Sequence, residues 1–291
     1  MSPESRVIFE QWSPPVFLTV VTLILASVYT CGWFAIRKTR SPLFPAWRLA
    51  SFLLGLAIIW LSIASPLDGF ADALLSAHMV EHLLLISFVP PLLLLSNPVV
   101  PLLRALPHGV TVYILAPFIR LKFLRVLGHF LTSPLIAWLA MNIIFLGWHI
   151  PVAYDFALEH ERWHDFEHIC FLGSAILFWW PIIRPWPTRA YRVGWLMLLY
   201  LASADVVNTA LSAFLAFCDR PVYNYYSIRP NPFHISPMSD QIAGAVIMWV
   251  IGSLVFLVPV ILIAVSLLQP QRLSRNIGSH QPMPLAGRRG F

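Results

Sequence analysis

Charged residues are scarce in this sequence. Of its 291 residues, 11% are charged, whereas 58% are hydrophobic and 14% are aromatic. A soluble domain carries about a quarter of its residues as charges, and one soluble core cannot bury so much apolar surface. The shortage of charge therefore argues against a soluble domain and indicates an integral membrane protein.

Several familiar signatures are missing as well. Cys31, Cys170 and Cys218 show no CxxC spacing, and their odd number argues against a disulfide framework. No stretch resembles a phosphate-binding glycine loop, a GxSxG nucleophile elbow or an HExxH zinc motif. The start, MSPESRVIFEQWSPP, lacks the basic region and cleavage site of a signal peptide, so we expect the first apolar run to remain in the folded chain.

Long uncharged runs, in contrast, are abundant and predict the fold. Seven are long enough to cross about 30 Å of hydrocarbon at about 1.5 Å per residue. We predict an all-α polytopic membrane helical bundle over residues 1–268, followed by a basic tail, 269–291, that is expected to be disordered. A weaker run, 110–119, is too short to span and is expected to be re-entrant or interfacial. The predicted spans are 16–36, 47–65, 73–95, 133–151, 164–183, 193–217 and 241–267.

Proline and tryptophan refine this prediction. Pro90 and Pro91 should break or kink the third span, because proline removes a donor and clashes with the preceding turn. Trp179, Trp180 and Trp186 are expected to form an interfacial aromatic belt at the end of the fifth span.

The basic residues predict the orientation of the chain. Loops 37–48, 104–125 and 184–192, together with 272–289, contain 15 of the 19 basic residues and none of the 13 acidic ones. Because cytoplasmic loops are enriched in Lys and Arg, we predict the N-terminus outside and the C-terminus inside. The net charge of +6 thus marks topology in a lipid bilayer, and nucleic acid is not an expected partner.

One motif occurs twice, at the start of two different spans. HMVEH at 78–82 and HDFEH at 164–168 both read HxxEH, which places two histidines one helical turn apart on the same face. Both spans enter from the predicted outer side, so the two motifs should meet there. Two imidazoles at this spacing can bind one metal ion or two adjacent ions, and the glutamate can act as a ligand, an orienting group or a base. The residues are His78, Glu81, His82, His164, Glu167 and His168.

Further polar residues map to the same membrane face. His149 closes the fourth span in GWHIP, and we predict it as a fifth metal ligand beside the four motif histidines. The alternative interpretation is a set of histidines at the membrane interface, which is the usual explanation for a single histidine at the end of a span. Additional ligands or orienting groups are sought among His160, Asp68, Asp72, Asp240, Met79 and Cys170, besides the two glutamates.

The residue types leave the identity of the metal open. Imidazole suits copper, zinc, iron and nickel alike. Met79 and Cys170 would favour Cu(I) if they face inward, although methionine on an apolar helix is more often a packing residue. Copper is the expected cofactor, with zinc or haem as alternatives.

Asp205 and Asn208 form a second polar feature, near the middle of the sixth span. A carboxylate at that depth needs a partner. Two interpretations are open at this stage: a proton or ion relay, or an interhelical hydrogen bond.

Three stretches resemble the CtaG family of caa3-type cytochrome c oxidase assembly factors. They are SPLDGFADALLSAHMVEHLLLISFVPPLLLLSNP (65–98), GWHIPVAYDFALEHERWHDFEHICFLGSAILFWWPII (147–183) and SPMSDQIAGAVIMWVIG (236–252). The resemblance places the five histidines where the family has its own, and Asp240 opens the family's last motif. Asp205 and Cys170 match no family motif.

The resemblance implies a role, and the residues suggest a mechanism. We expect a non-enzymatic assembly factor of the bacterial cytoplasmic (inner) membrane that binds copper at its outer face and assists metallation of the oxidase copper centre. Its partners would be oxidase subunits or other assembly factors. Alternatives are a haem-binding membrane cytochrome, an intramembrane zinc hydrolase using HxxEH, a copper transporter, and a metal-free assembly scaffold.

Overall fold

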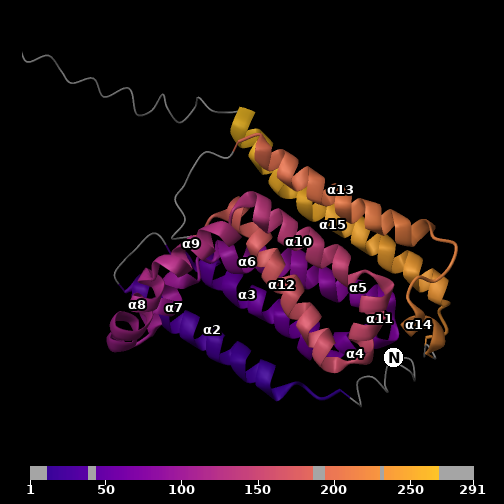
Figure 1. The fold of residues 1–291 in the computed structure, drawn as a ribbon. Helices are drawn as coiled ribbons and strands as arrows, with labels where there is room; N and C mark the ends of the chain where they lie inside the picture. The colour runs from indigo at the N-terminus through magenta and orange to yellow at the C-terminus, as the bar shows by residue number, and fades with distance from the viewer. Residues whose placement is uncertain (1–11, 39–43, 186–193, 230–232, 269–291) are drawn as a thin grey trace, which may run out of the picture.

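The computed structural model describes residues 12–38, 44–185, 194–229 and 233–268, and within these ranges the chain is helical and contains no strand (Figure 1). Six of its helices are long and apolar enough to cross a membrane. The helices Lys122–Leu131 and Pro134–Trp148, which meet at a bend of 66°, add a seventh span if the pair counts as one. The predicted all-α membrane bundle of about seven spans is therefore confirmed. Trp186 and the predicted tail, 269–291, lie outside the described residues.

The spans match the predicted runs, with shorter helices between them. The fourth predicted span, 133–151, ends earlier than expected, at Trp148, because Pro151 begins a new helix. Residues 110–120 form a short exposed helical stretch that is too short to span. The elements are α2 (Val16–Arg37), α3 (Ala46–Ala64), α4 (Pro66–Ala73), α5 (Leu75–Leu83), η1 (Leu84–Phe88), α6 (Val89–Leu95), α7 (Val99–Ala105), η2 (Val110–Leu115), α8 (Ala116–Arg120), α9 (Lys122–Leu131), α10 (Pro134–Trp148), α11 (Pro151–Glu159), α12 (Glu161–Ile183), α13 (Leu196–Phe217), α14 (Asn224–Ile228) and α15 (Pro237–Leu268).

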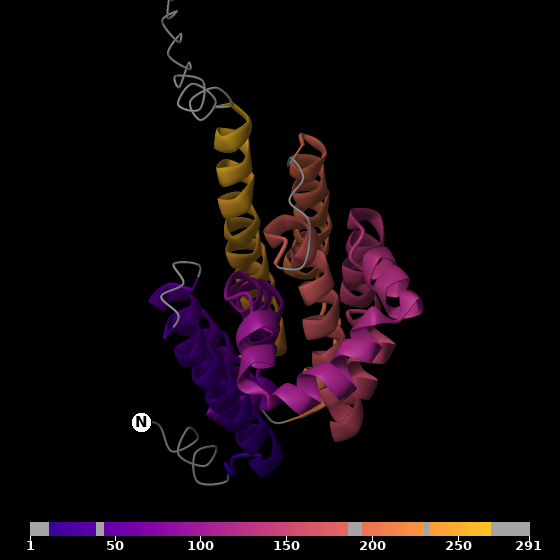
Figure 2. The ribbon, with the colours of Figure 1, turned by 90° about the vertical axis from the view of Figure 1, so that its left-hand side faces the viewer.

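The third span, made of α5, η1 and α6, lies at the centre of the bundle. It contacts α3, α12 and α15, and 61% of its most apolar window is buried, compared with 44% for α12 and less for the other spans. The helices α13 and α15 lie side by side in both ribbon views (Figures 1 and 2). The two HxxEH motifs thus belong to the two most buried spans.

Short helices gather at the two ends of the bundle. Figure 1 shows α4, α11 and α14 at the end where α5 and α12 begin, and α7, α8 and α9 at the opposite end. Both HxxEH motifs therefore share one end, as the alternation of loops predicts. The basic stretch 104–125 lies at the other.

The third span contains an interruption of its hydrogen-bond ladder next to its proline pair. The segment η1 is a π-helix, in which the Val89 amide donates to the Leu84 carbonyl, and Pro90 and Pro91 lie in the first turn of α6. The nitrogens four and five positions after Ile86 both belong to proline, so no helical amide can reach the Ile86 carbonyl. The prolines interrupt the helical hydrogen bonds of the third span as predicted, and the π-helix η1 forms at this interruption.

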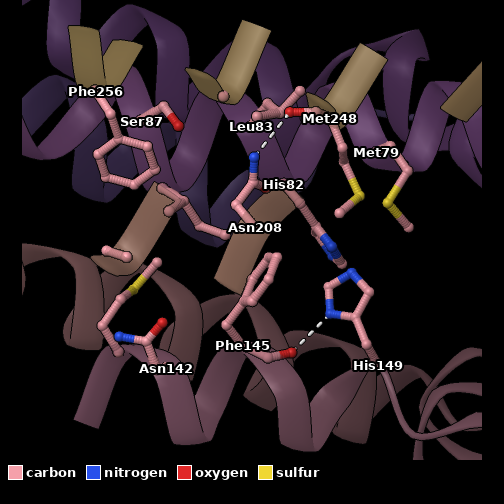
Figure 3. Close-up of a pocket in the computed structure, with 14 residues that line it drawn as sticks. Met79, His82, Leu83, Ser87, Asn142, Phe145, His149, Asn208, Met248 and Phe256 are labelled. Atoms are coloured by element: carbon pink, nitrogen blue, oxygen red, sulfur yellow. Dashed lines mark hydrogen bonds between the residues drawn. The ribbon is translucent and has the colours of Figure 1, made fainter. Parts of the chain in front are cut away.

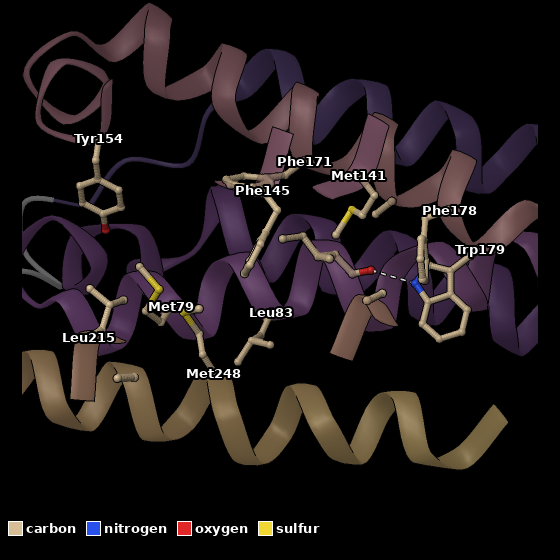
Figure 4. Packing of buried hydrophobic residues seen from close by; sticks show 14 of the residues in the cluster. Met79, Leu83, Met141, Phe145, Tyr154, Phe171, Phe178, Trp179, Leu215 and Met248 are labelled. Atoms are coloured by element: carbon tan, nitrogen blue, oxygen red, sulfur yellow. Dashed lines mark hydrogen bonds between the residues drawn. The ribbon is translucent and has the colours of Figure 1, made fainter. Parts of the chain in front are cut away.

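A tryptophan from α12 replaces the missing donor. The Trp179 indole nitrogen donates to the Ile86 carbonyl at 3.2 Å (Figure 4), and its side chain is 5% exposed. The prediction that Trp179 belongs to an interfacial aromatic belt is wrong, because its indole lies in the core, where it donates the hydrogen bond that the Ile86 carbonyl would otherwise lack.

Two hydroxyl groups hold the other side of the third span. Ser51 of α3 donates to the Leu92 carbonyl at 2.7 Å, and the Tyr29 hydroxyl of α2 donates to the Ser96 carbonyl at 2.9 Å. Tyr29 also stacks on Phe52, with ring centroids 3.9 Å apart. The first two helices therefore anchor α6 and its C-terminal end.

We expect Trp179→Phe to destabilise the protein by about 1–3 kcal/mol, because it leaves the buried Ile86 carbonyl without a donor. Unfolding in mixed detergent micelles, followed by circular dichroism, measures the loss. Trp163→Phe is a matched control on the same helix, where the indole is 46% exposed, and should cost less than about 0.5 kcal/mol. Equal losses in the two variants would contradict the assignment.

Candidate metal centre

The helices α5 and α12 present their HxxEH residues to each other. In each motif the histidines lie one turn apart on one helical face, and α12 packs on η1 and α6, just past the motif of α5. His78 and Glu81 are fully buried, and His164 is partly exposed. The remaining three residues, His82, Glu167 and His168, are at most 4% exposed.

The two motifs face each other reciprocally. His82 Nε2 lies 3.8 Å from Glu167 Oε1, and His168 Nε2 lies 3.5 Å from Glu81 Oε1. The glutamate of each motif thus faces the last histidine of the other. The first histidines, His78 and His164, have ring centroids 5.1 Å apart. The duplicated sequence motif has become an approximately two-fold arrangement of ligands.

His149 joins the cluster from the end of α10. Its Nδ1 donates to the Phe145 carbonyl at 2.7 Å, which leaves Nε2 as the nitrogen with a free lone pair. The His149 and His82 rings lie 6.4 Å apart between centroids, and Figure 3 shows them side by side. All five predicted histidines therefore lie in one region of the bundle; His149 adjoins the four motif histidines but belongs to neither group of residues that could hold a metal ion.

Tyr226 of α14 orients His78. Its hydroxyl donates to the Ala71 carbonyl at 2.9 Å and lies 3.2 Å from His78 Nδ1. Because that hydroxyl proton is already engaged, His78 Nδ1 must be the donor, and Nε2 faces His82 Nε2 at 2.8 Å. Sequence reasoning missed Tyr226; the available signal was the tyrosine-rich stretch VYNYYS between two spans.

Several buried atoms of the cluster have no hydrogen-bond partner in the described part of the chain. Buried polar groups are nearly always hydrogen-bonded, so each exception calls for an explanation. Carboxylate oxygens and imidazole nitrogens with free lone pairs are typical metal ligands. The unpartnered atoms are both side-chain oxygens of Glu81 and Glu167, His82 Nδ1, His149 Nε2, His164 Nε2, and both ring nitrogens of His168.

Two overlapping groups have the geometry to hold a metal ion. In His78, His82 and His168, one ligand atom of each residue lies within 4.8 Å of the others. The same is true of His78, Glu81 and His164. The first group is all imidazole and the second contains a carboxylate.

A small cavity of about 40 Å³ adjoins the cluster. It has room for an ion or a water molecule. His82, His149 and the thioethers of Met79 and Met248 line it, and Figure 3 shows the two sulfur atoms close to the histidine rings. Met79 therefore faces inward, as the Cu(I) hypothesis requires.

Two of the possible additional ligands lie outside the cluster. His160 is exposed at the start of α12, where its Nδ1 donates to the Phe156 carbonyl at 2.9 Å. Cys170 is half-buried and belongs to neither ligand group. Two residues along a helix turn the side chain by about 200°, which places Cys170 away from the face of His168.

Asp240 has another role in the structure. Its carboxylate, on α15, accepts hydrogen bonds from the backbone amides of Leu75 at 2.6 Å and Ser76 at 3.1 Å, and from the Ser76 hydroxyl. These amides begin α5, so Asp240 acts as an N-cap supplied by a distant helix. Gly244 permits this approach, because a Cβ there would lie 3.3 Å from the Ser76 Cα. Asp240 positions the histidine helix.

The polar pair in the sixth span makes interhelical hydrogen bonds. The Ser253 hydroxyl donates to Asp205 at 2.9 Å, and the Asn208 amide donates to the Met248 carbonyl at 3.3 Å (Figure 3). Gly252 leaves room for Asn208, because a Cβ there would lie 2.6 Å from the amide nitrogen. These contacts join α13 to α15 and favour the structural interpretation of the pair.

An acidic group lies at the end of the bundle where the cluster is found. Asp68 is half-buried in α4, and Asp72 is exposed. Burial, together with repulsion from Asp72, Asp165 and Glu161, raises the pKa of Asp68 to about 7. A negative potential at this end favours the approach of cations to the site.

The fold and the site define a class: a polytopic helical membrane protein with a buried histidine and glutamate cluster at one end. The chain belongs to the cytochrome c oxidase caa3 assembly factor family, Caa3_CtaG, which matches residues 27–269. The matched range contains every residue of the cluster.

Mycobacterial proteins are among the relatives. Uncharacterized proteins of Mycobacterium bovis and Mycobacterium tuberculosis are each 29% identical over 294 residues, and one of Mycobacterium leprae is 27% identical over 271 residues. The alignments cover 94%, 94% and 89% of this chain, but 43%, 43% and 39% of the relatives. The chain thus spans less than half the length of the curated relatives it matches. No solved structure matches the chain.

We expect Asp240→Ala to lower the free energy of unfolding by about 1–2 kcal/mol, because α5 loses a charged cap. Thermal unfolding of the detergent-purified protein measures the effect. Asp219→Ala serves as the control, because this exposed carboxylate should change stability by less than about 0.5 kcal/mol. A silent Asp240→Ala variant would refute the capping role.

Asp68 predicts a pH dependence of stability. Its pKa is about 7 in the folded chain and about 3.9 when unfolded. Between these values the unfolded chain releases the proton first, so the contribution of Asp68 to stability is full below about pH 4 and is lost as the pH rises to about 7. The free energy of unfolding of Asp68→Asn should therefore increase relative to that of the wild type as the pH rises from about 4 to about 7. Above about pH 8 the difference between the two should be constant. Melting curves at a series of pH values test this; a constant difference throughout would contradict it.

Proposed function

We propose that the chain binds copper through His78, His82, His149, His164 and His168 and assists metallation of the oxidase copper centre. The site would lie at the outer side of the bacterial cytoplasmic membrane, as the distribution of basic residues predicts. Membership of the caa3 oxidase assembly factor family supports the role in assembly. Oxidase subunits or other assembly factors would be the partners.

One observation carries the metal-binding proposal: five histidines and two glutamates from three helices converge in a buried site with unpartnered ligand atoms. Burying such groups without partners costs roughly 1–3 kcal/mol each. A set of interfacial histidines would point to water and lipid headgroups, whereas His78 is fully buried. A bound cation would offset this cost by coordinating the free lone pairs.

The sulfur atoms beside the cluster favour copper over zinc. Imidazole and carboxylate ligands suit both metals, but thioethers are soft ligands that select Cu(I). Met79 and Met248 line the cavity next to His82 and His149. A cuprous ion could therefore exchange an imidazole ligand for a thioether without leaving the protein interior.

The rival functions fit the geometry less well. A haem bound between histidines needs a porphyrin-sized slot, whereas the cavity at His82 and His149 measures about 40 Å³. A peptidase needs an open approach for its substrate, whereas His78 and Glu81 have no exposed surface. Transport needs a path of ligands through the bilayer, whereas Asp205 and Asn208 make hydrogen bonds between two helices.

The proposed mechanism is a transfer by ligand exchange. The histidines lie near the outer ends of their spans. They would therefore hold the ion inside the bundle but close to the outer face of the membrane. The ion could then pass to an acceptor site of similar depth in the assembling oxidase without entering bulk water. The chain supplies ligands and positioning, and no covalent step is required.

Metal content tests the proposal directly. Wild-type protein purified in detergent should contain near-stoichiometric copper by mass spectrometry, and the folded His78→Ala/His82→Ala/His164→Ala/His168→Ala variant should contain none. His160→Ala, at the exposed histidine that precedes the helix of His164 and His168, should keep the full content. Negligible copper in both wild type and variant would refute the proposal, and a Soret band would support the haem alternative.

The role in assembly has its own test. Oxidase isolated from cells lacking the protein should be deficient in copper, and expression of the wild type, but not of the four-histidine variant, should restore it. Fully metallated oxidase in the absence of the protein would contradict the role.

A further inference from the structure

The cluster contains more ligands than one ion can use. Its five imidazoles and two carboxylates amount to seven candidate ligands, whereas a zinc or copper ion in such a site takes about four. All seven except the partly exposed His164 are buried, so solvent does not satisfy them. Either several ligands remain unpaired beside one ion, or the site holds more than one ion.

The geometry separates these ligands into two positions. His78, Glu81 and His164 form one group, and His82 and His168 belong to the other, with His78 within reach of both. Glu167 lies 3.8 Å from His82, on the side of the second position. The first position thus combines two imidazoles with the carboxylate of Glu81. The second is made mainly of imidazoles, and Glu167 lies beside it without belonging to either ligand group.

The reciprocal arrangement of the two motifs also argues for more than one ion position. The two HxxEH motifs face each other reciprocally, with His82 opposite Glu167 and His168 opposite Glu81. The duplicated motif contributes the same three residue types from each of two helices. The helical positions i, i+3 and i+4 spread the three ligands of each motif over about one turn, or about 5.4 Å along the axis. Two ions at adjacent levels fit this spread better than one.

We propose that the cluster is a two-ion centre with non-equivalent positions; this rests on the proposed copper-binding function. The position around His78, Glu81 and His164 has a hard carboxylate ligand and lies toward the partly exposed His164, which suits Cu(II). The position around His82 and His168 adjoins His149 and the thioethers of Met79 and Met248, which suits Cu(I). The ions are held at neighbouring positions, one nearer the surface and one deeper in the bundle.

Metal stoichiometry tests the two-ion centre. Purified protein freed of metal and then loaded with excess copper salt, without and with a reductant, should retain two copper ions per chain after desalting. His164→Asn should retain one, and His168→Asn should retain one. His160→Asn is the matched control and should retain two. Circular dichroism and gel filtration verify that each variant is folded.

Wild-type protein alone keeps the test decisive if a variant fails to fold. Wild-type protein loaded with Cu(II) in the absence of reductant should hold Cu(II) at both positions and give a half-field transition in the electron paramagnetic resonance spectrum, whereas one ion gives an isolated copper signal. One copper per chain with an isolated signal would overturn the two-ion centre and leave the proposed function intact. No retained copper would overturn both. Loss of both ions in each single variant would contradict the independence of the two positions.

Discussion

Within a bilayer, every buried polar group must find its partner inside the protein, and much of this structure follows from that constraint. The central span shows it most clearly. Pro90 and Pro91 leave the Ile86 carbonyl without a helical donor, and Trp179 supplies one from α12. Ser51 supplies a further donor to the same span from α3. These contacts fix the rotation of the span that carries one of the two histidine motifs.

The histidine and glutamate cluster departs from this rule. Around it several contacts orient the ligands: Asp240 caps α5, Tyr226 engages His78, and the Phe145 carbonyl engages His149. At its centre, carboxylate oxygens and imidazole nitrogens remain unpartnered among the described residues. Outer hydrogen bonds that orient the ligands around a centre with unpartnered ligand atoms are the arrangement expected of a preorganised metal site. This contrast supports the proposal that this member of an oxidase assembly factor family binds a metal ion.

The last third of the chain contributes to the site mainly by positioning it. The helix α15 caps α5 through Asp240 and approaches it closely at Gly244. The same helix places Met248 in the cavity beside the histidines, while α14 brings the Tyr226 hydroxyl to His78. The sequence 236–252, with its serine, aspartate and glycine, therefore supports the geometry of a site whose principal ligands lie elsewhere.

The amino-acid sequence by itself determined the membrane class, the spans and the pairing of the two HxxEH motifs. Hydrocarbon runs and helical spacing are local properties, and the alternation of loops places both motifs at one end. Only the tertiary structure decided which polar residues meet. It brought His149 into the cluster, excluded His160, and made Asp240 a cap. Trp179 became a buried donor, and Tyr226 became a neighbour of His78. These outcomes depend on helix rotation and on contacts between residues up to 165 positions apart, which hydropathy and spacing along the chain cannot specify.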